Sequence, residues 1–192
     1  TALVTGVLTT TAAAVFNGGF TSNADTNTFT SANASDPLVI IKNTANDASG
    51  ARLSFQKDKG ANAADGDDIG TITFIGDNNA QEQTNYGSIV VEVSESQDTD
   101  EAGKMSFFVA ESNGTASQLT AGLIIEGEHA TDGEVDVTIA AGTASTTTVS
   151  GNLAVTTQLT ATSGAVSAPT YSFVGDTDTG ISRPTTNSVN IV

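Results

Sequence analysis

The sequence predicts an all-β protein, and three observations support that prediction. Only 15% of the residues are charged and 5% are aromatic, so no stretch has the composition of a charged, leucine-rich helix. Thr, Ala, Ser, Asn and Gly dominate instead, and β-branched side chains pack better on a pleated sheet than in a helix. The 19 glycines supply turns between many short strands. We expect an antiparallel β-sandwich or jelly-roll-like body, flanked by extended β shaft-like tracts and intertwined in a homotrimer.

Local amino-acid composition divides the chain into four segments. Residues 1–35 are predicted to form an extended, shaft-like lead rich in Thr, Ala, Gly and Asn, and residues 36–141 a strand-dense body of sandwich type. Residues 142–168 are predicted to form an extended β shaft-like ribbon, and residues 169–192 a truncated β-turn segment. Because Thr1 is not an initiator Met and no signal-peptide pattern follows it, we expect a fragment or a processed product.

Apolar residues of the body recur at alternate positions, which is typical of half-buried strands. Five runs place their apolar residues on one face: Leu53 and Phe55; Ile89, Val91 and Val93; Met105, Phe107 and Val109; Leu119, Ala121, Leu123 and Ile125; Val135, Val137 and Ile139. Two further runs, Leu38–Ile41 and Ile69–Ile75, are apolar on both parities and suit strands covered on both sides. About seven strands separated by turn clusters therefore predict a sandwich.

The ribbon also has one apolar face, with a hydroxyl-rich face opposite to it. A single ribbon of small side chains buries too little surface to offset roughly 1–2 kcal/mol per residue of backbone ordering. Three copies around an axis would pool their apolar faces, as neighbouring repeats do in repeat proteins. The residues that we expect near such a trimer axis are Val149, Leu153, Val155 and Leu159.

Charge and cysteine content exclude several classes of function. Twenty-two acidic and six basic residues give a net charge of −16, so the chain has no basic stripe for nucleic acid and is repelled by anionic membrane surfaces. No apolar run approaches the roughly 20 residues of a membrane span. Without cysteine, the fold depends on burial or assembly for its stability.

The residues that could perform chemistry are few. His129 is the one histidine, and without cysteine it leaves no zinc cluster or Cys–His pair within a chain. A Ser-His-Asp triad is arithmetically possible, but no Gly-x-Ser-x-Gly elbow accompanies it. The acids in two loops could in principle hydrolyse a glycoside or bind calcium, but we expect solvated turn acids. These acids are Asp65, Asp67 and Asp68, and Asp98, Asp100 and Glu101. The prediction is no enzyme, no catalytic residue, no cofactor and no metal.

The segment Pro169–Pro184 contains Tyr171, Phe173 and then Gly-Asp-Thr-Asp-Thr-Gly-Ile at residues 175–181, followed by Ser182 and Arg183. It resembles a segment common in bacteriophage tail fibres, although Ser182 replaces the aromatic residue that often follows the Ile. Gly175 and Gly180 permit positive φ angles, so a tight turn between strands is expected there. The body is similar to a domain of marine-phage fibres of the cyanophage type, through Arg52–Lys57, Ile69–Phe74 and Gly103–Phe107.

These resemblances imply a trimeric virion structural protein outside the cell, which joins other phage tail proteins to a receptor on the host. The receptor would be a surface polysaccharide or lipopolysaccharide, and neither nucleic acid nor membrane insertion is expected. A bacterial surface filament or adhesin shares the same composition and is an alternative. A polysaccharide depolymerase tailspike is a further alternative, and it would need a cleft with two poised acids.

Overall fold

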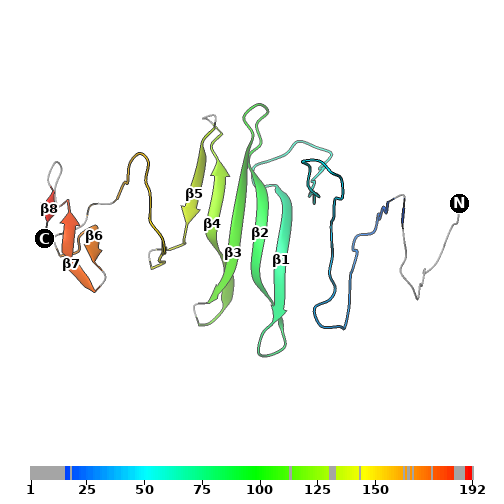
Figure 1. Cartoon of the computed structure of the whole chain (residues 1–192), viewed down its shortest axis with the longest axis horizontal. Coiled ribbons are helices and arrows are strands. Elements are labelled where there is room, and N and C mark those ends of the chain that lie inside the picture. Colours follow the sequence, from blue (N-terminus) through cyan, green and yellow to red (C-terminus); the bar gives the residue numbers. More distant parts are fainter. Residues whose placement is uncertain are drawn as a thin grey trace. The chain divides into compact units, whose positions relative to one another are not determined.

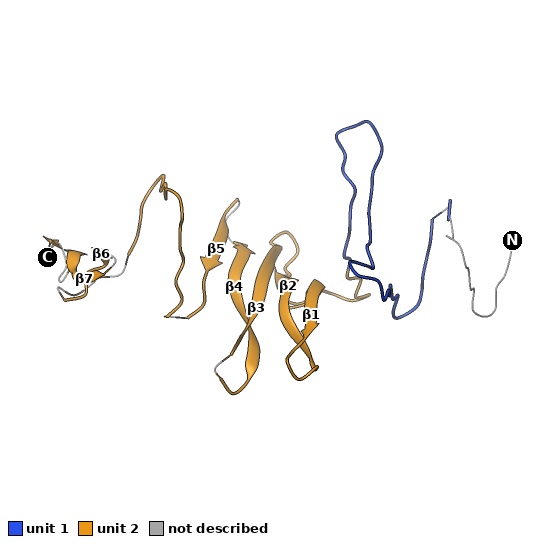
Figure 2. Ribbon diagram, turned by 60° about the horizontal axis from the view of Figure 1, so that its bottom comes forward, with its two compact units in different colours: residues 1–56 blue, residues 57–192 orange. Residues whose placement is uncertain are grey.

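A computed structural model describes residues 16–17, 19–112, 114–129, 133–142, 144–161, 163, 165, 167–173, 175–183 and 189–191. Every regular element among them is a β-strand, which confirms the all-β class and the antiparallel sheets. The chain divides into two units, residues 1–56 and 57–192 (Figure 2). All eight strands belong to the second unit.

The centre of the second unit is a five-stranded antiparallel sheet in the order β1-β2-β3-β4-β5 (Figure 1). Its strands follow one another along the chain as a meander: β1 (Asp68–Asp77), β2 (Gln83–Glu95), β3 (Ala102–Ser112), β4 (Ser117–Gly127) and β5 (Val135–Ile139). Consecutive strands pair with short connections, so each pairing has a small loop-closure cost. The turn from β1 to β2 shows how the sequence sets one connection, because the Asn78 side chain accepts hydrogen bonds from the amides of Ala80 and Glu82.

The register of the strands gives the sheet one strongly apolar face. Two apolar rows cross all five strands: Gly70, Val91, Met105, Ile125 and Val137; and Ile72, Ile89, Phe107, Leu123 and Ile139. Shorter rows flank them, with Val93 and Val135 beyond one side and Phe74 and Val109 beyond the other. The alternation predicted for Ile89–Val93, Met105–Val109 and Val135–Ile139 is therefore confirmed.

The alternation predicted for β4 is wrong in its first half. Phe107 pairs with Leu123, but the next residue Phe108 pairs with Ala121, so Gly122 is an extra residue in β4. Such a β-bulge reverses the faces of the residues before it. Leu119 and Ala121 consequently lie on the face opposite to Leu123, while Thr120 joins the apolar face beside Val109.

A sandwich needs two packed layers, whereas the described strands of the body form a single layer. Ile69–Ile75 lies in β1 as expected, but Ile72, Phe74 and Ile75 are exposed rather than covered on both sides. Leu38–Ile41 and the segment around Leu53 and Phe55 form no strand, and their apolar side chains are exposed. The described strands therefore do not supply the second layer of a sandwich.

A second, three-stranded antiparallel sheet lies near the C-terminal end, with β6 (Tyr171–Phe173), β7 (Asp176–Ser182) and β8 (Asn190–Ile191). Gly175, between β6 and β7, has a φ of 84°, as the predicted turn requires. Gly180 instead lies inside β7, where a Cβ would clash with the Tyr171 carbonyl oxygen and lie 2.8 Å from its carbon. Gly180 is thus needed for close backbone approach. Val174 and Pro184 of the fibre-like segment lie outside the described residues.

Candidate interaction surface

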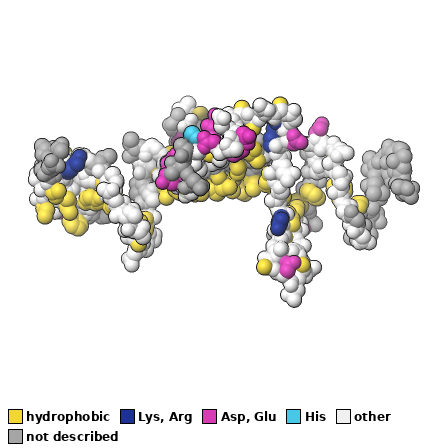
Figure 3. Space-filling model, turned by 90° about the horizontal axis from the view of Figure 1, so that it is seen from above, with side chains coloured by type: hydrophobic (Ala, Val, Ile, Leu, Met, Phe, Trp, Pro, Cys, Tyr) yellow, Lys and Arg dark blue, Asp and Glu magenta, His cyan; other side chains and the backbone are white. Residues whose placement is uncertain are grey.

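The most distinctive surface of the molecule is the apolar face of the five-stranded sheet. We define it by its large side chains: Ile72, Phe74, Ile89, Val91, Val93, Met105, Phe107, Val109, Leu123, Ile125, Val135, Val137 and Ile139. Hydrophobic side chains gather along one side of the sheet in Figure 3, while acidic side chains and His129 lie toward the other side. No Asp, Glu, Lys or Arg lies in the two rows that cross all five strands.

No described strand forms a layer over this face, and no Val, Ile, Leu, Met or Phe side chain is buried among the described residues. Phe74, Val137 and Ile139 are 56%, 57% and 58% exposed. Five strands about 4.8 Å apart and four rows about 6.8 Å apart give this side of the sheet an area of about 650 Å², of which the large apolar side chains occupy about two thirds. A contiguous apolar patch of several hundred Å² is toward the upper end of what a typical monomer exposes, and such patches often mark contact sites. The apolar face therefore has the chemistry of an interface.

The opposite face holds a charged row that also crosses all five strands: Asp68, Glu92, Lys104, Glu126 and Asp136. Lys104 Nζ lies 2.6 Å from Glu92 Oε1. The hydrogen bond to Glu92 raises the pKa of Lys104, and the negative charges of Glu92 and Glu126 add to that effect. Ser88 and Ser106, on the same face, are buried between their cross-strand neighbours. This mixed, charged face is suited to solvent.

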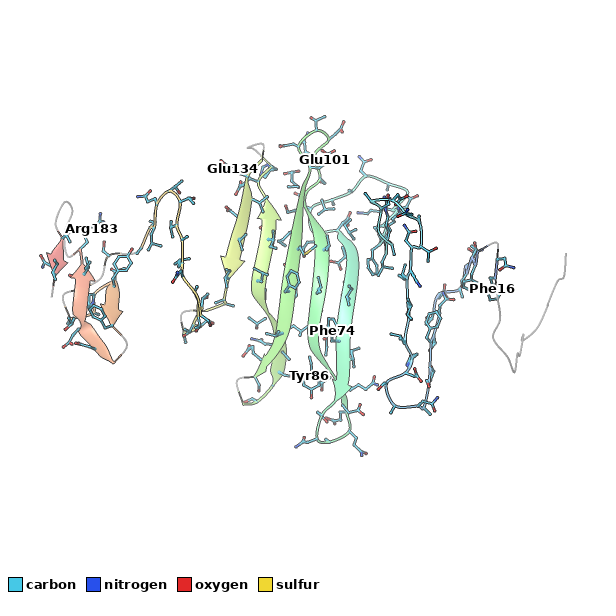
Figure 4. All side chains as sticks on the ribbon, in the orientation of Figure 1. Phe16, Phe74, Tyr86, Glu101, Glu134 and Arg183 are labelled. Carbon is cyan, nitrogen blue, oxygen red and sulfur yellow. The ribbon has the colours of Figure 1, made fainter. Side chains whose placement is uncertain are left out.

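The candidate histidine lies at the end of the sheet where β2 meets β3 and β4 meets β5. Glu101 and Glu134 mark this end in Figure 4, while Phe74 and Tyr86 lie toward the other end. His129 Nδ1 is 3.4 Å from Asp100 Oδ2 and 4.0 Å from Glu95 Oε2. Ser94 lines the same hollow as His129, but no hydrogen bond joins the two in the described part of the chain. His129 is thus placed against carboxylates of the neighbouring hairpin.

The loop acids near β1 bind groups of their own chain. Asp65 accepts hydrogen bonds from the amide and hydroxyl of Ser96, at 2.9 and 2.8 Å. Asp67 accepts from Lys59 Nζ and from the Ala64 amide, both at 2.8 Å. These bonds, with the Lys59 bond the strongest cause, lower the pKa of Asp67. Among the described residues no group of three or more His, Asp or Glu side chains is arranged to hold a metal ion, and no helix is long and apolar enough for a membrane span.

The predicted trimer-axis residues lie in an extended segment that pairs with no strand in the described part of the chain. The side chains of Val149, Leu153, Val155 and Leu159 are all exposed, between 45% and 66%. Their approach to a common axis stays a prediction. Sequence reasoning found the parity of most of the apolar face but assigned its burial to a second layer of the same chain. One signal in the sequence could have located this surface. Apart from the runs that form β1–β5, the body contains only two short apolar runs, at residues 38–41 and 53–55, which are too few for a second layer.

Comparison with known proteins adds no family to this description. No family model matches the chain, and neither a curated protein nor a solved structure matches it.

Proposed function

We propose that the chain is a non-catalytic structural segment of a bacteriophage tail fibre, a homotrimeric appendage of the virion that attaches to a host cell surface. Its partners are two further copies of itself, other tail proteins, and a surface polysaccharide or lipopolysaccharide of the host. The observation that supports this proposal most is the uncovered apolar face. A chain that buries no large apolar side chain in its described part gains its hydrophobic stabilisation from assembly.

The distribution of charge supports contact between identical copies. Each copy has a net charge of −16, which opposes association unless the acids are kept away from the contact. Most acids of the sheet lie on the opposite face or in the loops; the exception is Glu111, which shares the face of Val109 near the end of β3 and accepts a hydrogen bond from Thr120. The two rows that cross all five strands can therefore meet those of other copies without bringing carboxylates together. The extended segments expose Leu38, Leu53 and Leu153 in the same way, and copies of the chain would supply partners for them as well.

The assignment to a phage fibre rests on the segment around β6 and β7. Gly175 and Gly180 have separate structural roles there, one in a left-handed turn and one at a close backbone contact. A sequence pattern with such requirements is restrictive, which gives weight to its resemblance to fibre segments. The attachment role follows from that resemblance.

Two neighbouring phenylalanines provide the test of assembly. Phe107 lies on the apolar face and Phe108 on the opposite face. In the proposed trimer, Phe107→Asp buries three unpaired carboxylates, which costs several kcal/mol per ion, whereas Phe108→Asp leaves the interface intact. Native mass spectrometry should show trimers for the parent chain and Phe108→Asp, and monomers or unfolded chain for Phe107→Asp. A folded monomer of the parent chain at micromolar concentration contradicts the proposal.

The attachment role is tested with purified protein and bacterial surface glycans. We expect the trimer to bind a capsular polysaccharide or lipopolysaccharide fraction and to leave its size distribution unchanged after incubation. Progressive shortening of the polymer would assign the chain to the depolymerase class instead. Binding to none of a broad panel of such fractions would remove the attachment role while leaving the assembly result standing.

A further inference from the structure

We propose that the hollow beside the three-stranded sheet binds an acidic sugar of the host surface, with a carboxylate or a phosphate as its anionic group. This inference rests on the proposed attachment to a surface glycan and deepens it, because it names a site and the chemistry of the sugar. The extended tract before the sheet forms one side of the hollow, and strands β6 and β7 form the other. The argument depends on five lining residues: Gln158, Ser163, Tyr171, Ser182 and Arg183.

The hollow has the size and the mixed lining of a small-ligand site. Its volume of about 410 Å³ lies within the range of roughly 300–1,000 Å³ that is usual for ligand pockets. Tyr171 supplies an aromatic ring that is 44% exposed, Leu159 and Ile181 add apolar surface, and Gln158 adds a side-chain amide. A sugar ring has apolar faces and a polar rim, so it needs both kinds of lining. Leu159 is also expected near the trimer axis, and the site is therefore tested in the assembled protein.

Arg183 gives the hollow a positive charge. It follows β7 directly and lies beside the small sheet in Figure 4. Its Nε donates a hydrogen bond to Ser163 Oγ at 3.3 Å, and its guanidinium forms no ion pair with a carboxylate in the described part of the chain. Guanidinium groups bind carboxylates and phosphates through paired, charge-assisted hydrogen bonds. Arg183 is thus suited to the anionic group of a ligand.

The sequence around Arg183 is the least acidic part of a chain whose net charge is −16. Residues 137–192 contain two acids, Asp176 and Asp178, and one base, Arg183. Asp178 is five residues from Arg183, about 16 Å along an extended strand, whereas charges are largely screened beyond roughly 8 Å at physiological ionic strength. The acids nearest to Arg183 in sequence therefore oppose an anionic sugar only weakly.

Ser182 is a second, independent observation that points to a ligand. Its side chain is 1% exposed, and its Oγ has no hydrogen-bond partner among the described residues. Buried hydroxyl groups in folded proteins nearly always have a partner, because an unpaired one costs free energy. Ser182 borders the same hollow as Arg183. A polar group of a bound sugar would give this hydroxyl its partner.

Three sugars that share one ring test the chemistry of the ligand. Galacturonate has a carboxylate, galactose phosphate has a phosphate, and galactose has neither. Each is titrated into the full chain and followed by saturation-transfer NMR, after native mass spectrometry has measured the assembly state. We expect one of the two anions to bind about tenfold or more tightly than galactose, because a charge-assisted hydrogen bond is lost with the neutral sugar. The preferred anion identifies a uronic acid or a phosphorylated sugar as the source, and equal binding of all three overturns the proposal.

Two variants test the residues. Arg183→Gln should weaken binding of the preferred anion by about tenfold or more, whereas Arg52→Gln removes the same charge from an exposed position in the first unit and should have no effect. Ser182→Ala should also weaken binding, but its melting temperature should be unchanged or higher because an unpaired buried hydroxyl is removed. Unchanged binding in Arg183→Gln, or a lower melting temperature without loss of binding in Ser182→Ala, overturns the site.

The failure of this site is distinguishable from the failure of the attachment role. A parent chain that binds whole capsular polysaccharide or lipopolysaccharide fractions, but neither galacturonate nor galactose phosphate, overturns the site and leaves the attachment role intact. A parent chain that binds neither the fractions nor the sugars overturns both.

Discussion

Lys104 and Glu92 lie directly opposite each other on β3 and β2, and Lys104 Nζ is 2.6 Å from Glu92 Oε1. Both side chains are less than a third exposed, at 28% and 23%. Glu126 occupies the same row on the other side of Lys104. One cation thus lies between two acids in the middle of the face that we expect to contact solvent.

Replacing this lysine should weaken the sheet modestly. We expect Lys104→Met to lower the free energy of unfolding by up to about 1 kcal/mol, because the ion pair is lost and Glu92 and Glu126 are left without a cation between them. Urea denaturation at low ionic strength measures the change. Lys42→Met removes the same charge from an exposed position outside the sheet and serves as the control. Equal effects of the two variants would show that net charge, and not the cross-strand pair, is responsible.

The raised pKa of Lys104 predicts a loss of stability at alkaline pH. A lysine whose pKa is raised by folding adds stability that is fully present below its usual pKa of 10.5. That contribution disappears as the pH rises through the raised value, because the ammonium loses its proton and the hydrogen bond to Glu92 loses its charge. The free energy of unfolding, measured by urea denaturation from pH 9 to pH 12, should fall more steeply in the parent chain than in Lys104→Met. An equal dependence on pH in both proteins would contradict a raised pKa of Lys104.

The bulge at Gly122 predicts opposite outcomes for two leucines of one strand. Leu123→Asp places a carboxylate on the apolar face and should abolish the trimer, whereas Leu119→Asp lies on the other face and should preserve it. Sedimentation velocity distinguishes the two results. An uninterrupted strand would put both residues on one face, so loss of the trimer in both variants would argue against the bulge.

Gly180 should tolerate no side chain. Gly180→Ala places a Cβ against the Tyr171 carbonyl group, and we expect it to destabilise the three-stranded sheet by about 1–3 kcal/mol. Tyr171 and Tyr86 are the two tyrosines, so near-ultraviolet circular dichroism in a Tyr86→Phe background reports on Tyr171 alone. Gly151→Ala is the control, because a Cβ there has no neighbour within 4 Å. An unchanged Tyr171 signal in Gly180→Ala contradicts the prediction.

The extended tract provides a test of the predicted trimer axis. Leu153→Asp should bring three carboxylates together and lower the melting temperature of the trimer, because buried unpaired carboxylates are costly. Asn152→Asp adds the same charge on the other parity, where a solvent-exposed substitution changes stability by no more than about 0.5 kcal/mol. Differential scanning calorimetry compares the two. A larger effect of Asn152→Asp would mean that the hydroxyl-rich face of the tract faces inward.

Much of the sheet was predictable from the sequence because strand parity is a local property. The alternating residues of Ile89–Val93 and Met105–Val109 assign faces without knowledge of their partners, since successive side chains of any strand point to opposite sides. The turn at Gly175 was predictable for a similar reason, because glycine accepts a positive φ at little cost. The all-β class, the main apolar parity and this turn therefore follow from the sequence by itself.

The tertiary structure decided what depends on partners distant in sequence. The extra residue Gly122 is defined only by the pairing of β4 with β3, so alternation alone placed Leu119 on the wrong face. The role of Gly180 depends on the approach of Tyr171 from another strand. Likewise, periodicity marks which side chains need burial but not which layer buries them, and only the arrangement of strands showed that β1–β5 form a single layer. Hydrogen-bond ladders and packing are non-local, and a period of two contains no information about them.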